Sequence, residues 1–208
     1  MSRFKEIIQS EAQLTEILGQ PSEAVFNKSI NIIDKHCATF IAHTPFITIA
    51  SSDANGNVDV SPKGDPAGFV KVLDEKTIAI PDRLGNRRAD SFRNILENPK
   101  VGILFMIPGI RETLRVNGTA KIVTDLEIRT LLAHKGKLPQ LALIVEVEEA
   151  FMHCAKCIIR SKIWTNIDPE IKDKIPSLAT IIKDHAALDV PVEALDHYLK
   201  EDEKNGLY

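Results

Sequence analysis

Residues 80–88 read Ile-Pro-Asp-Arg-Leu-Gly-Asn-Arg-Arg, and this stretch joins a predicted strand to a predicted short helix. Four arginines gather in and just after it: Arg83, Arg87, Arg88 and Arg93. The chain as a whole carries a formal net charge of −3, so this positive charge is local. Gly85 allows a tight backbone approach, and the unpaired N–H groups at the start of a helix favour an anion. A phosphate monoester bound by Arg87 and Arg88 suits these features; a solvated basic loop is the alternative.

The segments on both sides of this stretch alternate with the period of a β-strand or form short apolar runs. The predicted strands span residues 46–50, 58–61, 69–73, 77–80, 101–107, 112–123 and 141–147. Asn55-Gly56 is typical of a tight hairpin turn, and Asn117-Gly118 predicts a bulge or kink. Because closure removes exposed sheet edges, we expect a mainly β fold with flanking helices, built on a closed, six-stranded antiparallel barrel. An open α+β sandwich is the alternative.

Helical patterns flank and interrupt the strands. Residues 22–36 and 148–160 are predicted as helices, and the helix that follows Arg88 should end before Asn98-Pro99, because a residue preceding proline avoids the α region. We therefore divide the chain into three parts. These are a helical N-terminal extension (1–45), the barrel (46–165) and a helical C-terminal extension (166–208).

The composition excludes several classes of protein. The 208 residues are 44% hydrophobic and 26% charged, as in soluble globular chains. The negative net charge and the 5% aromatic content argue against nucleic-acid binding. No apolar run approaches the roughly 20 residues that cross a bilayer, so we expect no membrane association. The 3 cysteines do not suggest a disulfide framework, and we expect a cytoplasmic protein.

Three segments in this order resemble a known family. They are residues 80–88, then Glu97-Asn98-Pro99-Lys100-Val101 with the apolar strand to Phe105, then residues 112–120, Glu-Thr-Leu-Arg-Val-Asn-Gly-Thr-Ala. Together they are similar to the FMN-binding split barrel of the pyridoxamine 5′-phosphate oxidase-like superfamily, over residues 46–147. The resemblance implies an FMN-dependent oxidoreductase that works as a homodimer, with two flavins at the subunit interface. The C-terminal Arg-x-His signature of the vitamin B6 oxidase itself is absent, which indicates another branch of the superfamily.

The resemblance also implies roles for individual residues. Arg87 and Arg88 would hold the FMN phosphate. The other cofactor-binding residues implied are Ser61 and Lys63 on an earlier strand, Pro81 and Asp82 beside the isoalloxazine ring, and Thr113 on the next hairpin. Because the flavin would carry the hydride or electron transfer, we expect neither a side-chain nucleophile nor a metal. The catalytic residues, the substrate and the electron donor remain unassigned.

A second group of residues lies at His153-Cys154-Ala155-Lys156-Cys157. A structural zinc site needs four ligands, and the chain has no second cysteine pair. A thioredoxin-type pair would place its first cysteine at the start of a helix that follows a strand, whereas the helix predicted over residues 148–160 puts Cys154 inside it. We therefore interpret both cysteines as structural or incidental.

Three residues on the same predicted helix share one face: Lys156, Arg160 and Trp164. By resemblance this face contacts the flavin, the substrate or the dimer interface. A solvated basic stripe with a packed tryptophan is the alternative. Two other functions also stay open. One is a non-catalytic flavin-binding or sensor protein, and the other is a barrel that binds haem or a deazaflavin.

Overall fold

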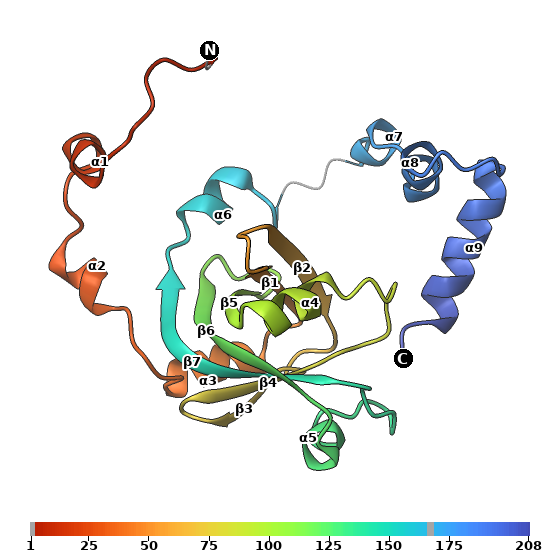
Figure 1. Ribbon diagram of the computed structural model, residues 1–208, viewed down its shortest axis with the longest axis horizontal. Coiled ribbons are helices and arrows are strands. Elements are labelled where there is room, and N and C mark those ends of the chain that lie inside the picture. Colours follow the sequence, from red (N-terminus) through yellow and green to blue (C-terminus); the bar gives the residue numbers. More distant parts are fainter. Residues whose placement is uncertain (1–2, 166–168) are drawn as a thin grey trace.

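The computed structural model describes residues 3–165 and 169–208, and it is mainly β with flanking helices (Figure 1). One antiparallel sheet has the strand order β2-β1-β5-β6-β7-β4-β3. Its strands are β1 (Phe46–Ser52), β2 (Val58–Gly64), β3 (Lys71–Asp74), β4 (Thr77–Pro81), β5 (Lys100–Met106), β6 (Thr113–Val123) and β7 (Ala142–His153). The described residues therefore form a seven-stranded open sheet, and the predictions of six strands and of closure were wrong.

A neighbouring segment contacts the sheet near each of its two edges. Helix α4 (Asp90–Glu97) lies beside β2, and the Ser91 hydroxyl donates a 2.8 Å hydrogen bond to Asp59. Beside β3, the turn that leads into β4 accepts a 2.7 Å backbone hydrogen bond at Glu75 from Ile33. A segment that covers part of an edge makes this edge less available for pairing with another chain.

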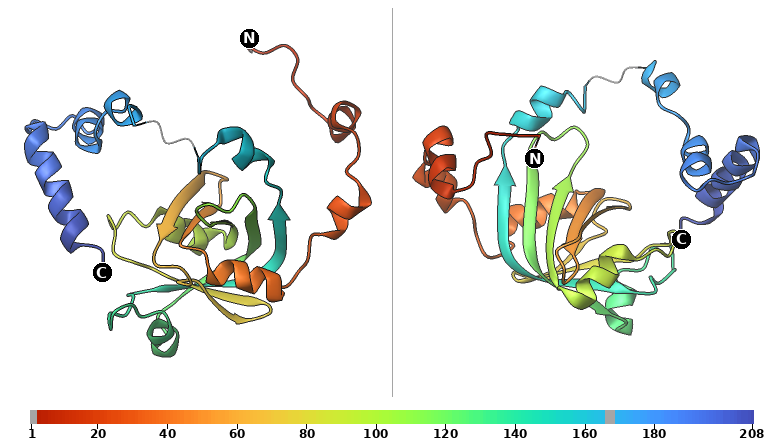
Figure 2. Two further views of the ribbon diagram at one scale, coloured as in Figure 1. Left: turned by 180° about the vertical axis from the view of Figure 1, so that it is seen from behind. Right: turned by 45° about the horizontal axis from the view of Figure 1, so that its top comes forward.

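The remaining helices lie before, between and after the strands. They are α1 (Glu11–Leu18), α2 (Glu23–Asn27), α3 (Lys35–Ala42), α5 (Leu126–Leu131), α6 (Lys156–Ser161), α7 (Ile171–Lys174), α8 (Leu178–His185) and α9 (Val192–Asn205). Figure 2 shows α1 and α2 on one side of the sheet and α7 to α9 on the other. Part of the predicted C-terminal extension, residues 166–168, lies outside the described residues. No helix in the described parts of the chain is long and apolar enough to span a membrane.

The helix predicted over residues 22–36 was wrong. Helix α2 ends at Asn27, and α3 begins only at Lys35. Between them, Ile30 pairs with Ala150 of β7 through two backbone hydrogen bonds of 3.0 and 2.7 Å. The apolar residues of this segment pack against the sheet from an extended backbone, so tertiary contacts outweigh the helical spacing.

The helix predicted over residues 148–160 was also wrong in its first half, because β7 continues to His153. A register shift between Asn117 and Gly118 forms the predicted bulge and lets β6 stay paired with β7 along its whole length. Glu149, which looked helical in sequence, is a cross-strand partner of Arg115 at 2.8 Å. Pairing with β6 therefore extends the strand through the charged segment.

The larger of two hydrophobic clusters in the described residues packs between the central strands and α3. Phe105, Ile47 and Ile103 of the central strands are almost completely buried, and α3 covers them with Ile41 and Cys37.

The predicted end of α4 before Asn98-Pro99 is confirmed, since the helix stops at Glu97. This stop returns the chain directly into β5.

Helix α3 depends on its N-cap. The Asp34 carboxylate accepts hydrogen bonds from the backbone N–H groups of Cys37 (2.8 Å) and His36 (3.1 Å), and the Cys37 N–H contributes most to lowering the pKa of Asp34. We expect Asp34→Ala to lower the free energy of unfolding by about 1 kcal/mol in urea denaturation, as for other capping aspartates. The control is Asp125→Ala, because Asp125 caps α5 without a side-chain hydrogen bond. Equal losses in the two variants would contradict the capping role.

The same cap predicts a pH dependence. Because the folded pKa of Asp34 lies below its unfolded value, the stabilisation is complete above the unfolded pKa of about 3.9 and is lost as the pH falls through the folded pKa. The difference in stability between wild type and Asp34→Ala should therefore shrink in strongly acidic solution.

Candidate functional site

A cavity of about 510 Å³ opens beside the basic loop. Its walls come from β2 (residues 59–63), the loop and the first turn of α4 (82–92), the segment that precedes β7 (137–141) and Tyr208. The sheet places these walls together because β4 pairs with the start of β7, so that Pro81 lies opposite Ala142. The volume lies within the range of about 300–1,000 Å³ that small-molecule and cofactor sites occupy.

The structure brings five of the predicted cofactor-binding residues to this cavity. Its lining includes Ser61, Lys63, Asp82, Arg87 and Arg88. They come from two segments of the chain that are separated by β3 and β4. Five of the side chains that the family resemblance implies therefore line one cavity.

The other predicted site residues lie elsewhere. Pro81 is buried at the end of β4 and is not part of the lining. Thr113 is buried at the first position of β6, opposite His153, whereas the cavity lies near the other end of that strand. Lys156 and Arg160 are exposed on α6, and the Trp164 indole donates a 2.8 Å hydrogen bond to the Ile110 carbonyl. In a single chain these residues do not reach the cavity.

The basic loop has an unusual backbone. Arg87 and Ala89 adopt φ angles of 62° and 58°, in the left-handed region that residues with a Cβ rarely occupy. The Asn86 side chain supports this turn by accepting a 3.0 Å hydrogen bond from the Arg88 backbone N–H. Ala89 then starts α4 without a side-chain cap. Strained backbone of this kind is concentrated at binding sites, where the surrounding structure holds it in place.

The arginines of the loop differ in their partners. Arg88 is 76% exposed and forms an ion pair with Asp90, whereas Arg87 has no ion pair among the described residues. Arg83 forms an ion pair with Asp65 at 2.5 Å. The positive charge predicted for the loop is therefore partly neutralised, and Arg87 and Arg88 are its exposed part.

Lys63 and Asp82 form an ion pair inside the cavity, with 3.5 Å between the ammonium and a carboxylate oxygen. About a quarter of each side chain is exposed. Burial raises the pKa of Asp82, and the neighbouring Lys63 charge opposes that rise. The Lys63 ammonium also lies 5.4 Å from the centre of the Phe92 ring. The pair gives one wall of the cavity a donor and an acceptor of fixed position.

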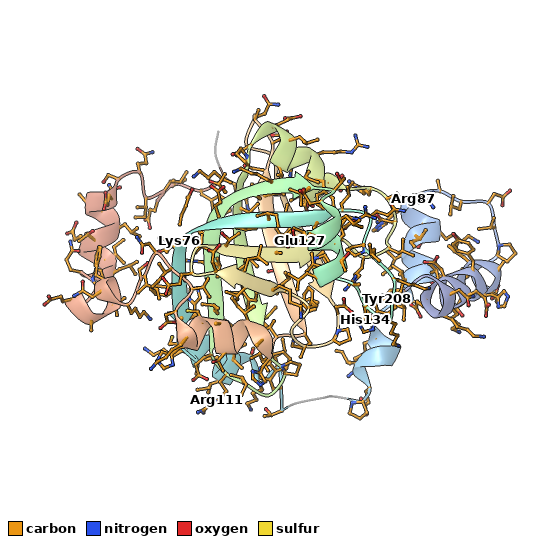
Figure 3. The ribbon with its side chains drawn as sticks, turned by 90° about the horizontal axis from the view of Figure 1, so that it is seen from below. Lys76, Arg87, Arg111, Glu127, His134 and Tyr208 are labelled. Atoms are coloured by element: carbon orange, nitrogen blue, oxygen red, sulfur yellow. The ribbon has the colours of Figure 1, made fainter. Side chains whose placement is uncertain are left out.

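A second polar group at the cavity edge was missed in sequence. The Asp65 side chain is 1% exposed and accepts hydrogen bonds from Arg83 (2.5 Å) and from the Tyr208 hydroxyl (2.6 Å), and this second bond raises the pKa of Tyr208. The Tyr208 ring stacks on His134 with 4.5 Å between ring centres. Figure 3 shows Arg87, His134 and Tyr208 on the side that faces the C-terminal helices. Sequence offers no signal for a contact 143 residues apart.

The cavity can bind an anionic ligand with a flat apolar portion. Arg87 and Arg88 supply guanidinium donors at one end, and Phe92, Leu138 and Leu141 supply apolar surface. No cluster of potential metal ligands occurs among the described residues.

Comparisons with solved structures found several similar chains. HupZ from Group A Streptococcus is 22% identical, with 58% of this chain and 93% of that chain covered and a TM-score of 0.48. A proposed pyridoxamine 5′-phosphate oxidase of Lactobacillus delbrueckii is 23% identical, with coverages of 59% and 95% and a TM-score of 0.47. HutZ, the haem storage protein of Vibrio cholerae, is 17% identical, with coverages of 57% and 93% and a TM-score of 0.42.

The sequence was also compared with curated proteins and with models of protein families. No curated protein matched the sequence. The family model described as pyridoxamine 5′-phosphate oxidase matches residues 33–154, which is more than half of the chain and includes the basic loop and all seven described strands of the sheet. The chain belongs to the pyridoxamine 5′-phosphate oxidase family.

Proposed function

We propose that the protein is an FMN-dependent oxidoreductase whose flavin binds in the cavity beside the basic loop. The observation that carries this proposal is the convergence of Ser61, Lys63, Asp82, Arg87 and Arg88 on one cavity of about 510 Å³. A family with oxidase members makes a redox function the first one to test. The acceptor and donor of electrons are small molecules that we leave unassigned.

The residues present fit FMN in their donor chemistry. A phosphate dianion needs several N–H donors, and the unpaired Arg87 supplies a guanidinium without breaking any described ion pair. Arg88 can join it by exchanging Asp90, an exposed partner, for the phosphate. The isoalloxazine ring needs a flat apolar surface with a few polar groups, which Phe92, Leu138 and the Lys63–Asp82 pair provide.

The chain itself contributes binding, orientation and partial exclusion of water. FMN, when bound, supplies hydride or electron transfer. Lys63 and Asp82 hold a positive and a negative group against the flavin-binding wall, and their ion pair keeps both in one position. Asp65 fixes Arg83 and Tyr208 at the cavity edge, so that this edge keeps its shape.

We propose a homodimer as the working form. Thr113, Lys156, Arg160 and Trp164 are distant from the cavity within one chain, because β6 separates them from it. If these residues contact the flavin, as the resemblance implies, a second copy must bring them there. Sedimentation of the flavin-loaded protein tests this proposal. If the loaded protein is a monomer, these four residues do not belong to the flavin site.

The spectrum and mass of the copurifying small molecule test the cofactor. We expect a yellow protein that releases FMN on denaturation and whose reduced flavin is reoxidised rapidly by oxygen or an organic acceptor. A reduced flavin that is never reoxidised at a useful rate would indicate a sensor. A protein that stays colourless with excess FMN would contradict the proposal.

A Soret band would indicate haem, and a released deazaflavin would indicate that alternative cofactor. The cavity lining favours a flavin over haem. It contains no histidine, cysteine or methionine to serve as an axial ligand, and the Tyr208 hydroxyl is already bonded to Asp65.

A further inference from the structure

The cysteine pair lies in a different environment from the one that the sequence predicted. Strand β7 ends at His153, Cys154 follows directly, and α6 begins at Lys156. Cys154 is thus not inside a helix, which was the reason for interpreting the pair as structural or incidental. Both thiols are free and exposed, whereas Cys37 is buried.

The backbone holds the two cysteines close together. Ala155 has φ −68° and ψ −10°, and Lys156 is the first residue of α6, so residues 154–157 form a right-handed turn. Such a turn keeps its first and fourth Cα atoms within about 7 Å. A disulfide usually joins Cα atoms roughly 4.4–6.8 Å apart. Cys154 and Cys157 therefore have backbone positions that a disulfide can join with little movement.

The surroundings of Cys154 favour its thiolate. The backbone N–H of Lys156 donates a hydrogen bond to Cys154 and contributes most to lowering the pKa of that thiol, and the charges of Lys156 and Lys28 act in the same direction. Lys28 is held here by a 3.1 Å hydrogen bond to the Met152 carbonyl and by the Phe151 ring, 4.2 Å away. By contrast, burial raises the pKa of Cys37 to about 11. An exposed thiol in an electropositive setting is the reactive kind.

We propose that Cys154 and Cys157 form a redox-active dithiol that exchanges with small disulfides such as oxidised glutathione. The Cys154 thiolate attacks one sulfur of the small disulfide, forms a mixed disulfide and releases one thiolate. The Cys157 thiol, after losing its proton to solvent, attacks the Cys154 sulfur, forms the internal disulfide and releases the second thiolate. The small disulfide gains the two electrons that the protein dithiol loses. This proposal does not depend on bound flavin.

The test uses the reduced full-length protein with oxidised glutathione under nitrogen. Samples are quenched with acid, alkylated and weighed by mass spectrometry. We expect a short-lived adduct with one glutathione, and then a product lighter by two hydrogen atoms in which only Cys37 is alkylated after denaturation. Wild-type protein that accumulates glutathione adducts without the internal disulfide would overturn the proposal.

Two variants identify the attacking cysteine. Cys157→Ser should stop at a stable mixed disulfide on Cys154, since the second thiol is missing. Cys154→Ser should react at least about tenfold more slowly, because it removes the thiol whose thiolate is favoured by the Lys156 backbone N–H and by the charges of Lys156 and Lys28. A Cys154→Ser variant that reacts at the wild-type rate would overturn the assignment of Cys154 as the attacking thiol.

Discussion

Replacing Arg87 and Arg88 together with alanine is expected to weaken FMN binding by several kcal/mol. Each charge-assisted contact to the phosphate contributes roughly 1.5–3 kcal/mol. Arg88 should contribute the smaller part, because its release from Asp90 costs one ion pair. Titration of the flavin-free protein with FMN, followed by quenching of flavin fluorescence, measures the change.

Two controls make this result specific to the phosphate. Riboflavin lacks the phosphate, so its affinity should be the same in wild type and in the double variant. The second control is the double variant Lys35→Ala with Lys121→Ala. It also removes two positive charges, but from residues outside the cavity lining, and it should leave FMN affinity nearly unchanged. If the double arginine variant binds FMN like the wild type, the phosphate lies elsewhere.

Gly118→Ala is expected to destabilise the fold by about 3 kcal/mol or more, at the upper end for single substitutions. A Cβ at Gly118 would lie 2.2 Å from the Glu146 carbonyl oxygen and 3.0 Å from Cγ1 of Val145. Both neighbours belong to β7, which is paired on both sides, so the backbone has little freedom to move away. Urea denaturation measures the loss.

Gly64→Ala is the matched control, because this strand glycine has only ordinary contacts of 3.6 Å. We expect its free energy of unfolding to stay close to that of the wild type. Similar values for the two alanine variants would mean that β6 and β7 can separate at the bulge at low cost. The bulge would then not require the close approach between Gly118 and the Glu146 carbonyl of β7.

Local sequence signals predicted the features that depend on few neighbours. The bulge at Asn117-Gly118 is confirmed, as is the end of α4 before Asn98-Pro99. Gly56 adopts a φ of 84° in the predicted hairpin turn. Each of these follows from the conformational range of one or two residues, which chain neighbours alone determine.

The errors have a common physical cause. Segments 22–36 and 148–160 have helical spacing or composition, but Ile30 pairs with Ala150 of β7, and Glu149 lies on the part of β7 that pairs with β6. Pairing with a distant strand outweighs a propensity worth a fraction of a kcal/mol per residue. Cys154 was placed inside a helix because that helix was predicted to begin too early, whereas β7 continues to His153.

By itself the sequence determined the order of strands and turns along the chain and the family pattern around residues 80–88, in which Arg87 and Arg88 stand out. Only the tertiary structure decided that Arg83 is neutralised by Asp65, that Tyr208 closes the cavity edge and that Cys154 follows a strand. The division has a physical reason. Turn and bulge conformations are properties of neighbouring residues, whereas ion pairs, cavity walls and strand ends depend on which distant segments the sheet brings together.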